Sequence, residues 1–280
     1  MDNKDYEQCK EHVLEFLNSK WESKNLSEKI DKLIQYPFDN LNADNVSKFD
    51  ADNTDLAKWI YYIIWHDSTD NAYALKNLKC LDNIGPDCTY RGETINSFKN
   101  IFGENFKYIA KFGLYKKDIY DELLKKISTI GNFMLLPGET ENRQSLNNLK
   151  NSCCKDFPDL FFYRLYPQGK LINIDDNTDI FKFVSEKNKG ILPQEFKVFS
   201  IKNILESFTY LENDEYFPKI IYSEECKPYD TLNLGAIKNV ENYKDYYKNF
   251  LQLYVPRAIE MINDRAKRIG AILKERLKVM

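Results

Sequence analysis

The chain has 280 residues, with 40 Lys and Arg against 43 Asp and Glu, for a formal net charge of −3. Apolar residues make up 43% and charged residues 30%, which is typical of globular proteins and excludes disordered, collagen-like and low-complexity chains. The near-zero charge argues against a sequence-independent nucleic-acid coat protein, because such binding draws its affinity from clustered Lys and Arg. It leaves room for a local basic patch.

Two further features indicate the compartment. No apolar run approaches the roughly 18 residues that a membrane span needs, and the charged start MDNKDYEQCKEHVLEF has no apolar signal-peptide block. We therefore expect a cytoplasmic protein without membrane contact. The six cysteines should be reduced thiols in that compartment, and their spacing matches no C-x2-C zinc knuckle.

Apolar spacing predicts helices along the first 65 residues. The first 35 residues read as two helices, the second opened by an Asn25-x-x-Glu28 capping box and ended by Pro37. Asn53 or Thr54 should cap a third helix through Trp65, which is apolar nearly all round and therefore belongs in the core.

The middle of the chain is more mixed. Residues 80–91 read as a loop, and Thr94 is the predicted N-cap of a helix that ends near Gly103. Residues 117–128 predict an amphipathic helix, and the apolar segment 129–138 is either a short buried strand or an ordered loop. Further on, residues 156–166 and 200–211 predict helices, with a strand expected at 170–174.

The C-terminal region carries the clearest helical pattern. Apolar residues recur from Tyr243 to Leu273, and Pro256 either opens a new helix or kinks a continuous one. Four arginines are expected at outward or flanking positions: Arg257, Arg265, Arg268 and Arg276. The chain shows no repeat and no Gly/Ser linker. We predict a mainly α fold, with one helical domain over 1–280, minor β content in its middle and an N-terminal subregion at 1–85.

A first candidate binding segment runs from Tyr90 to Phe98. Its glycine turn leads into the helix predicted at Thr94, where exposed amides beside Arg91 would suit an anion such as phosphate. We take Arg91, Glu93 and Asn96 as its ligand-binding candidates. The alternative is an ordinary cap in which Thr94 accepts an amide hydrogen bond and Arg91 pairs with an acidic neighbour.

A second candidate combines the segment around Asn132 with the polar run 141–148. Asn132, Asn142 and Arg143 could contact a ligand, or the asparagines could close the local turns that hold a buried loop. A binding role predicts that both candidate segments lie together and line one concavity. Separate burial, with every amide bonded to local backbone, would make them structural.

These two segments also carry a resemblance. Arg91 to Phe98 and Thr129 to Pro137 resemble the R-G-acid-T-x-N-S-F and T-I-G-N-F-x-x-x-P motifs of a family of bacterial proteins that has no established activity. The resemblance names relatives and implies no reaction.

A more distant similarity reaches over about a third of the chain. Gly131 to Leu136, Asn142 with Asn147, and Ile262 to Ile269 with Arg265 are similar to segments of the C-terminal HNH-type nuclease domain of modification-dependent restriction endonucleases. Such a nuclease needs a His base and metal ligands. This chain has only His12, expected on an amphipathic helix, and His66, expected at a helix end where a cation complements the helix dipole. The similarity therefore implies an inactive copy or a different set of catalytic residues.

A separate nuclease site is the competing hypothesis. Asp176 (or Asp175), with Glu195 and Lys197, fits the carboxylate and lysine pattern of Mg²⁺-dependent nucleases, where carboxylates bind the metal and lysine orients water. The same E-x-K pattern recurs from Glu22 and from Glu225, so a chain this rich in Glu and Lys produces it readily without a metal site.

Taken together, these features favour a binding protein of a bacterium or phage. Its partner would be a protein or a nucleic acid, in the setting of phage defence or mobile genetic elements. No cofactor is expected, with Mg²⁺ needed only by the nuclease alternative.

Overall fold

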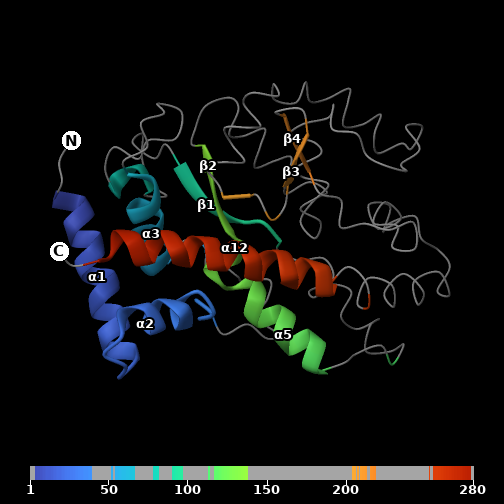
Figure 1. The fold of residues 1–280 in the computed structure, drawn as a ribbon, viewed down its shortest axis with the longest axis horizontal. Helices are drawn as coiled ribbons and strands as arrows, with labels where there is room; N and C mark the ends of the chain where they lie inside the picture. Colours follow the sequence, from blue (N-terminus) through green and yellow to red (C-terminus); the bar gives the residue numbers. More distant parts are fainter. Residues whose placement is uncertain are drawn as a thin grey trace.

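A computed structural model gives the arrangement of the helices and strands (Figure 1). It describes residues 4–39, 52, 54–66, 78–81, 90–96, 113, 117–137, 204–205, 207, 209–212, 215–218, 252 and 255–278. The fold is mainly α-helical, as the sequence predicts. Within these ranges, no helix is both long enough and apolar enough to cross a membrane.

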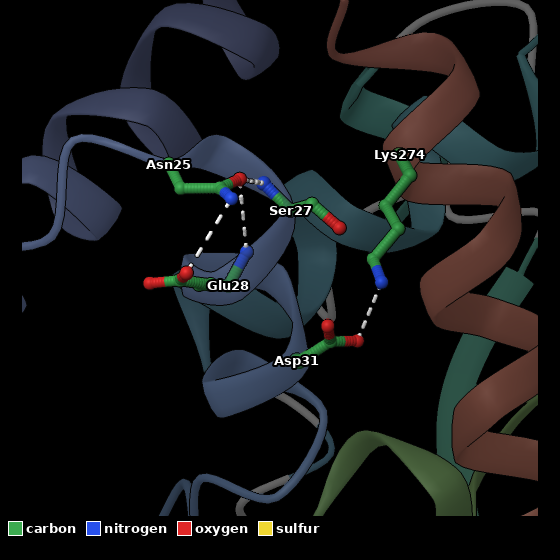
Figure 2. A network of polar contacts seen from close by, with 5 residues as sticks. All are labelled: Asn25, Ser27, Glu28, Asp31 and Lys274. Carbon is green, nitrogen blue, oxygen red and sulfur yellow. Dashed lines mark hydrogen bonds and ion pairs between the residues drawn. The ribbon is translucent and has the colours of Figure 1, made fainter.

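Two helices open the chain, as predicted: α1 (Lys4–Lys20) and α2 (Leu26–Leu33). The Asn25 side chain caps α2 by accepting hydrogen bonds from the backbone N–H groups of Ser27 and Glu28, at 2.9 and 3.4 Å (Figure 2). The predicted capping box is therefore present, in a modified form. Glu28 accepts from the Ser23 hydroxyl and the Asn25 amide, and the Asn25 N–H donates to Ser23.

The third predicted helix is α3 (Asp55–Trp65), capped by Thr54, whose hydroxyl accepts from the Ala57 N–H at 3.4 Å. Its residues 60–65 are all buried, so this nearly all-apolar helix lies in the core as expected. It packs against α1. At its C-terminal end, Arg276 Nη1 donates to the Ile63 carbonyl at 2.7 Å and pairs one of the carbonyls that the end of a helix leaves free.

The long helix α12 (Val255–Arg276) runs across the molecule and contacts α2, α3 and α5 (Figure 1). Pro256 lies in its first turn, a position that suits a proline. The residues that would show whether a helix continues before it, 243–251 and 253–254, lie outside the described residues. The buried positions repeat at helical spacing and include Ala258, Ile262, Ile269 and Leu273. Lys274 of α12 also bonds Asp31 of α2 at 2.6 Å (Figure 2).

The middle of the chain supplies short elements around α12. After the 3-10 turn η3 (Leu78–Leu81) come β1 (Tyr90–Thr94), α5 (Lys117–Ile127), the 3-10 turn η5 (Ile130–Asn132) and β2 (Phe133–Pro137). β1 and β2 pair antiparallel, from Tyr90 opposite Pro137 to Thr94 opposite Phe133. Residues 129–137 of the apolar segment are thus a turn followed by a short strand, and their described side chains are buried.

Two predictions need correction. Thr94 ends strand β1 instead of capping a helix, because β-branched Thr94 fits the pairing with apolar β2 better than a helical start. The remainder of that predicted helix, residues 97–103, lies outside the described residues. Residues 200–211 are not one helix either: Ile204 has φ 56°, and Thr209–Glu212 form β3, paired with β4 (Glu215–Pro218). The predicted helix 156–166 and strand 170–174 lie outside the described residues.

Candidate functional site

The two motif glycines lie where the chain allows no side chain. A Cβ on Gly92 would stand 2.3 Å from the Asp52 carbonyl oxygen and 2.7 Å from the Tyr61 ring. A Cβ on Gly131 would stand 2.4 Å from the Ile262 carbonyl oxygen. These glycines let β1 lie close against α3, and η5 close against α12.

Asn132 fastens β1, η5 and α5 together with one side chain. Its Oδ1 accepts from the Asn96 N–H at 2.9 Å, and its Nδ2 donates to the carbonyls of Asn96 and Ile127 at 2.7 and 2.8 Å. The first two bonds copy the pattern of a strand partner, so the side chain continues the β1–β2 ladder by one residue. The third pairs the last carbonyl of α5.

The backbone of Asn96 is hydrogen-bonded, whereas, within the described part of the chain, its side chain is not. Its N–H and C=O both bond Asn132, and the Ile95 N–H donates to the Asn132 carbonyl at 2.6 Å. Asn96 has no exposed surface, and neither Nδ2 nor Oδ1 has a hydrogen-bond partner among the described residues. A buried polar group without a partner costs about 1–3 kcal/mol of stability.

Arg265 is the largest fully buried side chain among the described residues. Its Nη1 donates to the carbonyls of Gly131 and Ile130, at 2.9 and 3.2 Å. The expected outward position is therefore wrong. The helical spacing does indicate that Arg265 is buried, because it follows Ile262 by three residues and precedes Ile269 by four, on the same apolar stripe.

Tyr61 joins these groups from α3. It is fully buried, and its hydroxyl has no hydrogen-bond partner within the described part of the chain. Burial raises the pKa of Tyr61 well above its ordinary value, as does the charge of Asp52; Arg265 lowers it and Glu93 raises it. The hydroxyl therefore stays protonated and is a neutral hydrogen-bond donor. Asp52 is also buried, and Glu93 is half-buried.

We call these residues the β1 polar cluster; they are Asp52, Tyr61, Glu93, Asn96, Asn132 and Arg265. The structure brings three predicted site residues into it: Glu93, Asn96 and Asn132. The sequence analysis did not select Asp52 or Tyr61, and it assigned Arg265 no site role. The Arg91 side chain, Asn142 and Arg143 lie outside the described part.

Other predicted chemistry has a different outcome. No helix N-terminus stands at Thr94 to offer the expected anion site, because Thr94 lies in strand β1. Asp176, Glu195 and Lys197 lie outside the described residues. Within the described ranges, no group of three or more His, Cys, Asp and Glu side chains could hold a metal ion. His12 lies on α1 and His66 directly follows α3, as expected, and their rings stack on Trp59 and Tyr6 with ring centroids 4.6 and 3.7 Å apart.

No family model matches the chain, and neither a curated protein nor a solved structure matches it. The β1 polar cluster is therefore the candidate functional site. The Asn96 amide and the Tyr61 hydroxyl are among its neutral hydrogen-bonding groups, and Asp52, Glu93 and Arg265 are its charged ones.

Proposed function

We propose that this chain is a binding protein and that the β1 polar cluster is its ligand site. The observation that carries the proposal is the side chain of Asn96. It is buried without a hydrogen-bond partner among the described residues, on a backbone that Asn132 holds at both its N–H and its C=O. A ligand that paired with this amide would meet a group already held in position.

A purely structural role explains Asn132 and leaves Asn96 unexplained. All three hydrogen bonds of the Asn132 side chain tie backbone segments together, so the fold gains from that side chain. The amide of Asn96 adds no such bond and carries a desolvation cost. Polar groups that cost stability in this way are characteristic of functional sites.

The groups of Asn96 and Tyr61 that have no partner among the described residues are neutral, so they favour recognition by hydrogen bonds over attraction by charge. Arg265 directs Nη1 at two backbone carbonyls, and Tyr61 is held neutral. The ligand is a nucleic acid or a protein partner. The motif resemblances suggest a bacterial or phage protein of the cytoplasm, working in phage defence or with mobile genetic elements.

A gel-retention experiment tests the proposal. The purified chain is incubated with single- and double-stranded DNA and RNA, with and without Mg²⁺ and Mn²⁺, and the Asn96→Ala variant is run beside it. Asn263→Ala, which alters a half-buried asparagine of α12, is the matched control. We expect retention by the wild type and the control and its loss in Asn96→Ala.

Two results would contradict the proposal. Equal retention by Asn96→Ala would place the ligand elsewhere. Metal-dependent cleavage that Glu195→Ala abolishes would establish the nuclease alternative. If no nucleic acid is retained, the same three proteins serve as bait for host proteins, and a partner lost only by Asn96→Ala would support the site.

A further inference from the structure

We propose that the group that Asn96 binds is the edge of a nucleobase. This inference rests on the proposed ligand site. Nδ2 donates while Oδ1 accepts, so the ligand must offer an acceptor directly beside a donor. Each common nucleobase offers such a pair along its edge, and asparagine amides pair with base edges in this two-bond manner.

An extended peptide is the competing ligand, and the chain itself shows how it would bind. Asn132 holds the N–H and C=O of Asn96 as an asparagine would hold one residue of a bound strand. Peptides that add to a sheet edge draw affinity from a row of backbone hydrogen bonds. The backbone N–H and C=O of Asn96 are already paired with Asn132, so they are closed to a bound peptide. A nucleobase needs only the two hydrogen bonds to the side-chain amide of Asn96.

The burial of Asn96 also favours a nucleobase as the ligand. Asn96 has no exposed surface, so its ligand must be a narrow group that enters the interior and displaces what covers the amide. A flat heterocycle, turned out of an unpaired strand or free in solution, meets this requirement. A folded protein partner contacts the outside of a surface and would not reach the amide.

The charges determine where the affinity comes from. The chain carries a net charge of −3, and the cluster holds the carboxylates of Asp52 and Glu93. Both features oppose phosphate, so the base should supply the affinity. We therefore expect a weak dependence on salt, in contrast to the steep dependence of proteins that neutralise many phosphates.

Equilibrium dialysis of the full chain against the four ribonucleosides tests this inference. Short single-stranded oligonucleotides of one base each, and the matching duplexes, form the other arms. We expect at least one base to bind, and Asn96→Ala to bind it about tenfold or more weakly while Asn263→Ala is unchanged. Binding of free nucleosides would identify a small-molecule source, and binding of oligonucleotides alone an unpaired strand.

Circular dichroism first establishes that Asn96→Ala is folded, and Asn96→Ser replaces it if it is not. The inference fails if the wild type binds no nucleoside or oligonucleotide. It also fails if Asn96→Ala binds them as tightly, or if the binding falls steeply with salt. A protein partner whose binding depends on Asn96 would contradict the nucleobase inference while leaving the proposed ligand site intact.

Discussion

At the residue scale, Gly131 and Gly270 both lie at contacts of α12 and differ in what an added methyl group would meet. On Gly131 it would strike the Ile262 carbonyl oxygen at 2.4 Å, part of a rigid helix backbone. On Gly270 it would meet the methyl groups of Ile34 at 3.2 Å, and these can shift. The first contact forces the backbone apart, and the second asks for a small movement.

We therefore expect Gly131→Ala to lower the free energy of unfolding by about 1–3 kcal/mol. Gly270→Ala should change it by less than about 1 kcal/mol, because alanine favours the helix by roughly that amount and offsets the crowding. Urea unfolding of the two variants and the wild type measures both values. Equal effects would show that η5 does not press on α12 as described.

Cys9 is a free, buried thiol close to Asp5. Burial, and then the Asp5 charge, raises the pKa of Cys9 from 9.0 to about 12. Since the thiolate is the reactive form, iodoacetamide at pH 8.5 should leave Cys9 unmodified in the folded protein and modify it in urea. Peptide mass spectrometry reads the modification, and fast labelling of the folded protein would contradict the burial.

The same pKa shift links stability to pH. Below about pH 9 the thiol is protonated in the folded and the unfolded chain alike, and its contribution is fully present. As the pH rises from there towards 12, the unfolded chain loses this proton while the folded chain keeps it. Stability therefore falls with rising pH over this window.

At the element scale, α2 depends on its cap. The helix has eight residues, too few to be stable alone, and Asn25 pairs two N–H groups of its first turn (Figure 2). Asn25→Ala should lower the free energy of unfolding by about 1 kcal/mol, whereas Asn25→Asp, an equally good cap, should match the wild type. Thermal unfolding of both compares them, and identical losses would mean that the cap contributes nothing specific.

Elements with local signals could be predicted from the sequence. Helices α1, α2, α3, α5 and α12 follow from apolar spacing, caps and one proline, all of which act within a few residues. Strand β1 was missed because its partner β2 lies about 40 residues later. A short strand whose stability comes from a distant partner leaves a weak local pattern, and a plausible N-cap outweighed it.

The site has the same division between local and distant information. The motif spacing selected Glu93, Asn96 and Asn132 as candidates. The contact between the two asparagines joins positions 36 residues apart, and Arg265 reaches Gly131 from 134 residues away. The sequence pattern assigns Tyr61 only to the apolar core of α3, because its sequence neighbours do not show which charges the fold places beside it.

At the scale of the whole molecule, α12 joins the two ends of the chain. It contacts α2 and α3 from the N-terminal region and α5 and η5 from the middle. A chain shortened to residues 1–254 would expose the apolar faces that α12 covers. We expect it to lack a cooperative thermal transition by circular dichroism. A folded, cooperative fragment would contradict the central place of α12, as would independent folding of residues 1–85.

The central claim is that Asn132 stabilises the fold while the Asn96 side chain is kept for a ligand. One measurement compares the free energies of unfolding of Asn132→Ala and Asn96→Ala with that of the wild type in urea. Asn132→Ala should lose about 2–4 kcal/mol, because three backbone groups lose their partner. Asn96→Ala should stay within about 1 kcal/mol of the wild type or exceed it, since it removes an unpaired buried amide. A loss in Asn96→Ala as large as that in Asn132→Ala would show that the Asn96 amide is bonded within the fold, and would contradict the account.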